Sequence, residues 1–390
     1  MNFPDIPYID ELVALRRDIH AHPEPAFQEN RTAGIVAREL ERFGIAVHRG
    51  VGKTGVVGVL KAGSGAGSIG LRADIDALPL VEHNDFAYRS VYPDLMHACG
   101  HDGHTVMLLG AARYLAEHPD FDGTAVFIFQ PAEEGEGGAL EMIKDGLFQR
   151  FPMDSVYGLH NWPGLAEGKI AAFAGPIMAG INRFEITLRG RGGHAAMPHL
   201  ADDVIIAASQ LATSLQTVTS RSLHPAEEAV VSVTRFDAGS AWNVLPEKAT
   251  LRGTIRVFTP EARKAIEEAI TRLANGTAAA YGASAEVKFT YIDAPTVNTA
   301  AEAELCFDVA RGILGNDRAT NEPRPSMASE DFSCLLEQRP GCYVWLGSGP
   351  ETAGHALHGP RYDFNDAILP IGVAYWVRLA QTLLADRIAA

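Results

Sequence analysis

The chain has 390 residues, of which 47% are hydrophobic and 21% charged, and its formal net charge is −15. Its composition is that of a globular protein whose length favours two domains, and so acidic a chain lacks the basic surface that nucleic acids and anionic membranes require. No segment approaches the roughly 18 apolar residues of a membrane span and no secretory signal is visible, so we expect a cytoplasmic protein with reduced cysteines.

The first part of the chain alternates helical and strand patterns. Amphipathic helices are predicted at 9–22, 31–44 and 102–118, and short buried strands at 54–60, 68–74, 124–130 and 154–160. Strands that alternate with helices predict an α/β domain built on a mixed or largely parallel sheet.

The pattern changes near residue 180. A strand at 181–190 carries Phe184, Ile186 and Leu188 on one face, which is the period-2 pattern of a half-buried strand. We then expect, in order, a helix with apolar positions from 204 to 218, strands at 229–236 and 249–258, a helix with apolar positions from 266 to 281, and a strand at 285–292. This β-α-β-β-α-β order predicts a ferredoxin-like α+β domain inserted at 181–291, after which the chain returns to the first domain and ends in a long helix near 365–387.

Polar residues cluster in five short segments, most of them where predicted strands end. They are Asp74 and Asp76 in LRADIDALP, His97, Cys99, His101, Asp102 and His104 in MHACGHDGH, Glu133 and Glu134 in PAEEGEGGA, His160 in GLHNWPG, and His355 and His358 in HALHGPRYDF. Sites in α/β sheets form at the carboxyl ends of strands, so we expect these side chains to meet.

Thiolate, imidazole and carboxylate ligands together suit Zn, Co, Ni or Mn. Each segment alone has a simpler explanation: Cys99 as a small core residue, His160 as a hydrogen-bonded histidine, Asp74 and Asp76 as turn caps. The combination of five segments favours a metal centre. For His97 and His355 a structural role and a role in the site both stay open.

The adjacent carboxylates Glu133 and Glu134 suggest a division of labour. A hydrolytic metal centre needs one carboxylate to hold metal and another to accept a proton from water and return it to the leaving group. Two neighbouring residues in a glycine-rich loop can meet both needs.

The segments LRADIDALP, HACGHDGH, PAEEGEGGA, LHNWPG and GRGGHAAMPH resemble the metallopeptidase family M20, in its amidohydrolase subgroup. The resemblance implies a zinc-peptidase-like α/β catalytic domain formed by 1–180 and 292–390, with two divalent metal ions (Zn, Mn, Co or Ni) per subunit. It implies that Cys99, His101, Glu134, His160 and His358 hold the metals, that Glu133 is the general base and that Asp76 orients a ligand. Asp74 and Cys99 fit the amidohydrolase subgroup, whereas other M20 peptidases carry His and Asp in these motifs; which ligand bridges the metals stays open.

The inserted domain at 181–291 resembles the lid and dimerisation domain of the family. The resemblance implies that His194 stabilises the oxyanion, that Asn243 and Arg256 grip the substrate carboxylate, and that the chain is a homodimer through this domain or a tetramer. A surface turn for His194 and a solvated strand position for Arg256 are the plainer alternatives.

The implied reaction is hydrolysis of the amide bond of N-acyl amino acids, with an acetyl or a benzoyl (hippurate-like) group, to a carboxylic acid and a free amino acid. Within the family the alternatives are an N-acetyl-diaminopimelate deacetylase or a dipeptidase. Outside it they are a metal-binding protein without activity and an amidase with Cys99 as nucleophile.

Overall fold

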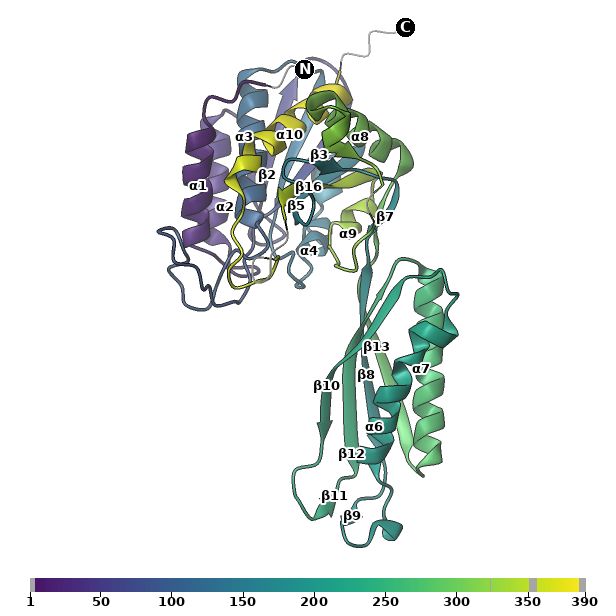
Figure 1. Ribbon diagram of the computed structural model, residues 1–390. Helices are drawn as coiled ribbons and strands as arrows, with labels where there is room; N and C mark the ends of the chain where they lie inside the picture. The colour runs from purple at the N-terminus through teal and green to yellow at the C-terminus, as the bar shows by residue number, and fades with distance from the viewer. Residues whose placement is uncertain (1–3, 323, 351–355, 386–390) are drawn as a thin grey trace. The chain divides into compact units, whose positions relative to one another are not determined.

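The computed structural model describes residues 4–322, 324–350 and 356–385. The chain forms two compact units, shown in Figure 1. The second unit comprises residues 178–296 and 325–330, and the first comprises the rest. Residues 325–330 belong to the second unit although the insertion was expected at 181–291, because the backbone N–H of Ala179 lies 3.0 Å and 2.9 Å from the carbonyls of Ser326 and Ala328.

The first unit is built on an eight-stranded mixed sheet with the order β1-β2-β4-β3-β5-β16-β6-β15. The strands are β1 (Ala46–Val51), β2 (Gly55–Ala62), β3 (Ser68–Asp74), β4 (Gly123–Gln130), β5 (Ser155–Pro163), β6 (Ile170–Ala171), β15 (Ala319–Thr320) and β16 (Gly341–Gly349). β3 is parallel to β4 and β5, and β5 is parallel to β16. The carboxyl ends of these four strands therefore lie along one edge of the sheet, as the α/β prediction requires.

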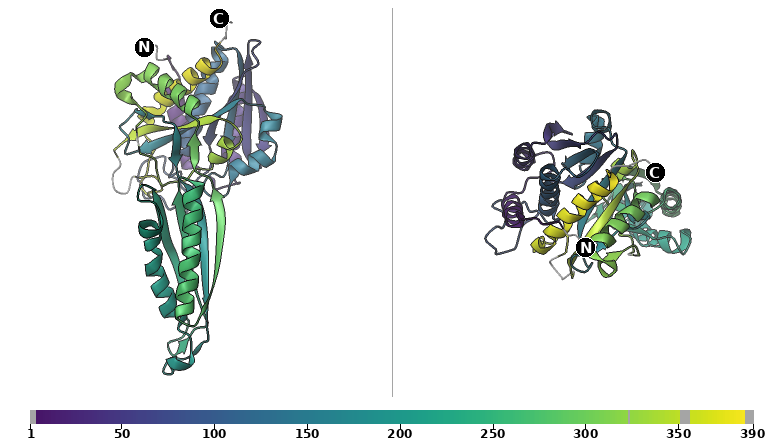
Figure 2. Two further views of the ribbon diagram at one scale, coloured as in Figure 1. Left: turned by 90° about the vertical axis from the view of Figure 1, so that its right-hand side faces the viewer. Right: turned by 90° about the horizontal axis from the view of Figure 1, so that it is seen from above.

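Helices cover the sheet of the first unit (Figure 2). They are α1 (Ile9–Ala21), α2 (Asn30–Arg42), α3 (His101–Glu117), α4 (Gly138–Lys144), α5 (Leu147–Arg150), α8 (Ala300–Leu314), α9 (Ser333–Leu336) and α10 (Leu369–Leu383). The helix expected near 365–387 is shorter, because the Asn365 side chain caps a 3-10 turn before α10 begins, and residues 386 and 387 lie outside the described chain. None of the helices in the described ranges is long and apolar enough to cross a membrane.

The second unit has a four-stranded antiparallel sheet with two helices on one face, which the left-hand view of Figure 2 shows. Its order is β10-β12-β8-β13, from β8 (Gly180–Arg189), β10 (Ala229–Ala238), β12 (Lys248–Val257) and β13 (Ser284–Asp293), with α6 (Val204–Leu215) and α7 (Pro260–Ala280). This arrangement confirms the ferredoxin-like prediction. The helix expected to reach residue 218 ends at Leu215, and a wider π turn (Val218–Ser222) follows.

Two short two-stranded sheets complete the strands. β9 (Gly193–His194) pairs with β11 (Val244–Leu245) at one end of the second unit, and β7 (Gly175–Met178) pairs with β14 (Thr296–Asn298).

Candidate metal centre

The predicted ligands of the first unit come from strand ends, loops and the start of α3, at the carboxyl edge of its sheet. Cys99 precedes α3 and His101 is the first residue of α3, so one turn carries both. Between them Gly100 has a φ of 89°, and a Cβ there would lie 2.2 Å from the Asn161 side-chain oxygen. Glycine is thus required for the turn that brings the thiol and the imidazole to one side.

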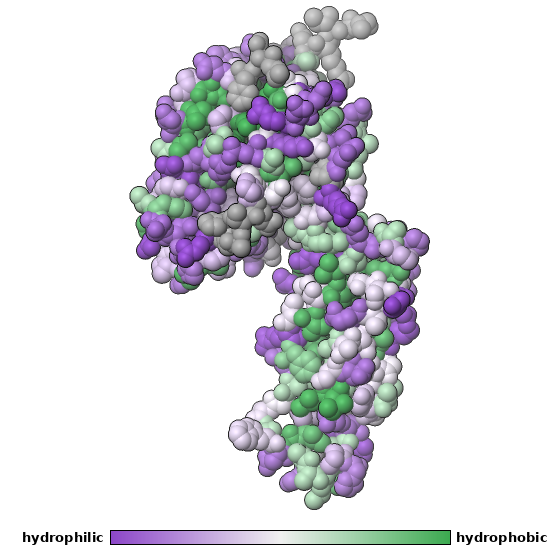
Figure 3. Space-filling model, viewed as in Figure 1, coloured by the Kyte–Doolittle hydropathy of each residue, from purple (hydrophilic) through white to green (hydrophobic). Residues whose placement is uncertain are grey.

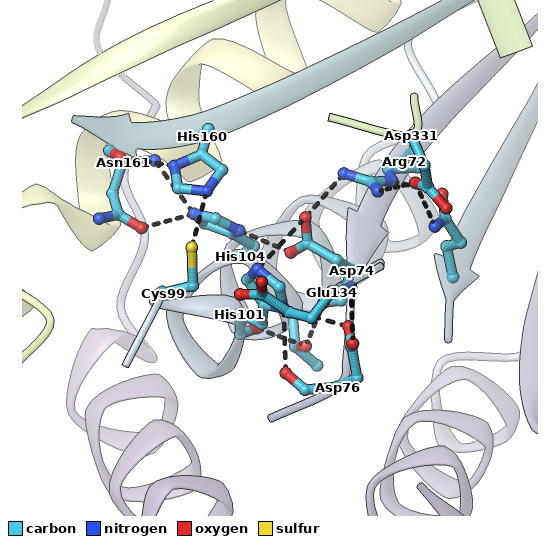
Figure 4. Close-up of polar contacts among 12 residues, drawn as sticks. Arg72, Asp74, Asp76, Cys99, His101, His104, Glu134, His160, Asn161 and Asp331 are labelled. Carbon is cyan, nitrogen blue, oxygen red and sulfur yellow. Dashed lines mark hydrogen bonds and ion pairs between the residues drawn. The ribbon is translucent and has the colours of Figure 1, made fainter. Parts of the chain in front are cut away.

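The structure brings all five predicted ligands together in overlapping groups. The possible ligand atoms of Cys99, His101 and His160 lie within 4.8 Å of one another, and so do those of Cys99, Glu134 and His358. Cys99 Sγ is 3.4 Å from His160 Nε2, and His358 Nε2 is 3.2 Å from Glu134 Oε1. Figure 4 shows the side chains of Cys99, His101, Glu134 and His160 turned toward one another.

Glu133 belongs to the same place. Its carboxylate forms a third group with His101 and Glu134, again with all ligand atoms within 4.8 Å. The two adjacent glutamates therefore share the site, as their proposed division of labour requires.

The imidazoles of the site are oriented through their Nδ1 atoms. His101 Nδ1 lies 2.9 Å from the Asp76 carbonyl and 3.2 Å from its Oδ1, and His160 Nδ1 lies 2.6 Å from the Asn161 carbonyl. Since these partners are acceptors, each Nδ1 donates, and Nε2 is the ring nitrogen that faces the other proposed ligands. His101 Nε2 is buried and makes no hydrogen bond within the described residues. This is the arrangement of metal-binding histidines.

The surroundings of His101 favour positive charge. Burial disfavours its protonated form, but the carboxylates of Asp74, Asp76 and Glu134 outweigh burial and raise the pKa of His101 to about 10. A buried imidazole with a bare nitrogen, a thiol and several carboxylates fit a divalent cation.

Two histidines of the predicted segments, His97 and His104, are not among the five predicted ligands, although the possible ligand atoms of His104 lie within 4.8 Å of those of Asp74 and His101. His104 Nδ1 lies 2.6 Å from Asp74 Oδ1 and its Nε2 lies 2.6 Å from Asn161 Oδ1, so both ring nitrogens are engaged. His97 is buried and belongs to none of the possible ligand groups in the described chain. His355 lies outside the described residues.

A buried ionic network behind Asp74 was missed by the sequence analysis. Arg72 Nη1 lies 2.7 Å from Asp74 Oδ2, and Arg72 Nη2 lies 3.2 Å from Asp331 Oδ1. All three side chains are at most 2% exposed. A charged residue within the apolar strand SIGLRAD was the available signal, because a buried arginine requires buried acidic partners.

The remaining predicted residues lie in the second unit, at its two ends. His194 on β9 is exposed and pairs in register with Val244, which follows Asn243. Arg256 lies near the end of β12, whereas the β9–β11 pair lies beyond the start of β12, at Lys248. Along an extended strand, at about 3.3 Å per residue, Arg256 and His194 are separated by roughly 25 Å or more.

Arg256 has a donor without a partner. Its Nη1 is buried and makes no hydrogen bond to any described residue. Burial and neighbouring Arg183 lower the pKa of Arg256, while Asp293 opposes them.

Nitrogen, sulfur and oxygen ligands that meet at a sheet edge, three of them buried (Cys99, His101 and His160), with a second glutamate beside them, are typical of a metal-dependent hydrolase. Residues 70–382 match Peptidase family M20/M25/M40, and the chain belongs to this family. It is therefore a metal-dependent amidohydrolase, an enzyme that cleaves amide bonds.

Similar proteins cover nearly the whole chain. A hippurate hydrolase of Campylobacter jejuni is 42% identical over 95% of this chain and 96% of its own length. An N-acetylcysteine deacetylase of Bacillus subtilis is 39% identical over 96% of this chain and 97% of its own length. A crystal structure of a dinuclear metal-binding M20 peptidase from Bacillus subtilis has a TM-score of 0.85 and 35% identity, over 97% of this chain and 99% of that one.

Proposed function

We propose that the enzyme hydrolyses the amide bond of N-acyl amino acids, releasing a carboxylic acid and a free amino acid. The observation that carries the proposal is the position of Glu133 and Glu134 with His101, all within 4.8 Å at the edge of the sheet. The two similar enzymes are named for hippurate and for N-acetylcysteine, and both compounds are N-acyl amino acids.

In this proposal two divalent ions are held by Cys99, His101, Glu134, His160 and His358. Zn, Mn, Co and Ni all suit this mixture of donors. Bound ions polarise a substrate carbonyl and lower the pKa of water.

Glu133 acts as the general base. It takes the proton of the attacking water and delivers it to the nitrogen of the leaving amino acid. Glu134 is assigned to the metals because its Oε1 lies 3.2 Å from Nε2 of His358, another proposed ligand.

Arg256 and Asn243 are proposed to bind the carboxylate of the substrate, and His194 to stabilise the oxyanion. The Nη1 of Arg256 makes no hydrogen bond to a described residue, which supports the proposal that it binds an anion. A guanidinium binds a carboxylate through two parallel hydrogen bonds. A donor to the oxyanion is worth about 3–4 kcal/mol in the transition state.

The two ends of the second unit support a homodimer. His194 and Asn243 lie at the end of this unit opposite to Arg256, so one unit cannot apply all three residues to one substrate. We propose that His194 and Asn243 act on a second copy of the chain. Exposed apolar side chains of this unit offer a surface for it: Met197, Leu200, Ile206, Phe236, Trp242 and Val244. Figure 3 shows that hydrophobic residues, in green, reach the surface of the second unit.

The test is hydrolysis of hippurate, several N-acetyl amino acids, N-acetyl-diaminopimelate and dipeptides, before and after chelation and after adding back Mn, Co, Ni or Zn. Metal-restored release of the amino acid from the first two substrate classes is the expected result. Faster cleavage of dipeptides or of N-acetyl-diaminopimelate would favour those alternatives. No release with any metal would favour a metal-binding protein without activity.

The Glu133→Ala variant separates catalysis from metal binding. It should keep both metals and the fold and lose about 100-fold or more in kcat, because general base catalysis contributes about 10²–10⁴-fold. A near wild-type rate would exclude Glu133 as the base. Activity that survives complete metal removal but not alkylation would instead indicate Cys99 as a nucleophile.

A further inference from the structure

Strained backbone gathers around one buried carboxylate. Four non-glycine residues of the described chain have positive φ: Phe27 at 57°, Lys53 at 78°, Ala132 at 54° and His358 at 60°. L-residues rarely adopt this conformation, and it persists where surrounding contacts hold it, often at functional sites. The first three lie in loops that meet at Glu29.

Glu29 is fully buried and accepts three hydrogen bonds. Its Oε1 accepts the backbone N–H groups of Phe27 and Ala132, each at 2.9 Å. Its Oε2 accepts the hydroxyl of Thr54 at 2.5 Å, directly after Lys53. One carboxylate thus connects three loops, and one of them is the loop that follows β4.

The hydrogen bond between Ala132 and Glu29 lies directly before Glu133 and Glu134 in the chain. The Ala132 N–H is held by Glu29, and its carbonyl accepts the N–H of Gly138 at 3.0 Å. Both sides of this left-handed residue are therefore fixed. Since Glu133 and Glu134 follow directly, the φ of Ala132 sets the direction in which their side chains leave the backbone.

We propose that Glu29 is a positioning residue for hydrolysis, which holds Ala132 in its left-handed conformation and thereby aims Glu133 and Glu134 into the metal site. The inference rests on the proposed function for the roles of these two glutamates. Without an acceptor at Glu29, the buried N–H of Ala132 loses its partner and the strained residue can relax to negative φ. Both carboxylates would then turn away from His101.

Two variants separate the hydrogen bonds of Glu29 from its charge. Glu29→Gln keeps Oε1 for both backbone N–H groups, and its amide can donate to the Thr54 oxygen. Glu29→Ala removes every acceptor. The geometry therefore predicts that the Glu29→Gln variant keeps the position of Ala132, which the Glu29→Ala variant loses.

Glu24 provides a matched control. Its carboxylate also accepts two backbone N–H groups, of Arg31 and Thr32 at 2.8 Å each, but it holds the start of α2 and not the loop of Ala132. Glu24→Ala should lower the melting temperature without changing the metal site.

The experiment measures kcat and KM for hippurate with Mn-loaded full-length protein, and the visible absorption of the Co(II)-loaded protein. Glu29→Ala should lower kcat by about 10- to 100-fold, the usual effect of losing a residue that supports metal ligands, with little change in KM and an altered Co(II) spectrum. Glu29→Gln and Glu24→Ala should keep the wild-type kcat and spectrum. Wild-type values for Glu29→Ala, or the same losses in Glu29→Gln or Glu24→Ala, would overturn the proposal.

Amide hydrogen exchange of the wild-type protein keeps the test decisive if Glu29→Ala does not fold. The Ala132 amide should exchange slowly, and exchange as fast as that of an exposed amide would overturn the proposal. A wild-type protein that cleaves neither hippurate nor N-acetyl amino acids would count against the proposed function, whereas the Co(II) spectra and the exchange rate would still decide the role of Glu29.

Discussion

Asp76 connects two of the proposed ligands without being one of them. Its Oδ1 lies 3.2 Å from His101 Nδ1, and its Oδ2 accepts the backbone N–H of Glu134 at 3.1 Å. One carboxylate thus fixes both the tautomer of an imidazole and the position of the loop that carries a glutamate ligand. Its two oxygens have different partners, so both are needed.

We therefore expect Asp76→Asn to impair the site although it is nearly isosteric. Its amide group must oppose either the His101 Nδ1–H or the Glu134 N–H, because both are donors. Metal affinity and kcat should each fall by about 10- to 100-fold. Metal titration and steady-state kinetics would check this, and an unchanged metal affinity would contradict the orienting role.

Arg256 offers a test of substrate binding. Arg256→Lys keeps the charge but removes the planar fork, and Arg256→Ala removes both. If the residue binds the substrate carboxylate equally in ground and transition states, KM should rise by about 10-fold or more in each variant while kcat changes little. An analogue with an amide in place of the carboxylate should show no such difference between wild type and variants; a KM equally sensitive with that analogue would exclude the role.

At the scale of elements, the loop between β4 and α4 is closed tightly. A Cβ on Gly138 would lie 1.6 Å from the Pro131 carbonyl oxygen. We expect Gly138→Ala to destabilise the fold by about 1–3 kcal/mol or more, as overpacking does, and to reduce activity because this loop carries Glu133. Gly312 in α8 has open space and is the control: Gly312→Ala should be neutral or stabilising by about 0.5–1 kcal/mol. Urea unfolding would measure the free energy of unfolding of both variants. A Gly138→Ala protein as stable as wild type would contradict the tight packing of Gly138 against Pro131.

Burial decides which elements the sequence predicts. β3, β4 and β5 are almost continuously buried, so their apolar runs stand out in the sequence. β1 is a sheet edge with a single buried residue, Val51, and its sequence AVHRGV gives no alternation to detect. It becomes a strand through its pairing with β2, which sequence patterns alone do not reveal.

The same distinction holds for the site. The proposed ligands could be predicted because Cys, His and Glu stand in recognisable segments: Glu134 follows the buried strand β4, His160 lies in β5, and Cys99 and His101 lie just before and at the start of α3. The residues that support them could not: Asn161 contacts His104 from 57 positions away, and Glu29 contacts Ala132 from 103 positions away. Asn and Glu are common on surfaces, so only the folded chain shows that these two are buried.

At the scale of the whole molecule, the acidic chain buries several of its charges in pairs. Arg16, His20 and Asp102 are all fully buried in the first unit. His20 Nδ1 lies 2.8 Å from Asp102 Oδ2, and His20 Nε2 lies 3.3 Å from Glu82 Oε1. The stability of the protein should therefore depend on the protonation of His20.

Burial disfavours protonated His20, but Asp102 and Glu82 outweigh burial and raise its pKa to about 9. Because the pKa in the unfolded chain is about 6.5, the folded state binds this proton more tightly. The stabilising contribution is thus complete below pH 6.5 and is lost as the pH rises through 9. Its upper limit is about 3.5 kcal/mol, since each pKa unit is worth about 1.4 kcal/mol.

Urea unfolding at pH 6, 7.5 and 9 would test this, with the metal content held equal in wild type and a His20→Gln variant. The comparison with the variant is needed because other groups titrate in the same range. Burial raises the pKa of the Cys342 thiol, so the unfolded chain loses that proton first and both proteins weaken at high pH. The difference between wild type and variant isolates His20 and should shrink from pH 6 to pH 9. A difference that stays constant would show that His20 is neutral in the folded protein, and that Asp102 is balanced by Arg16 alone.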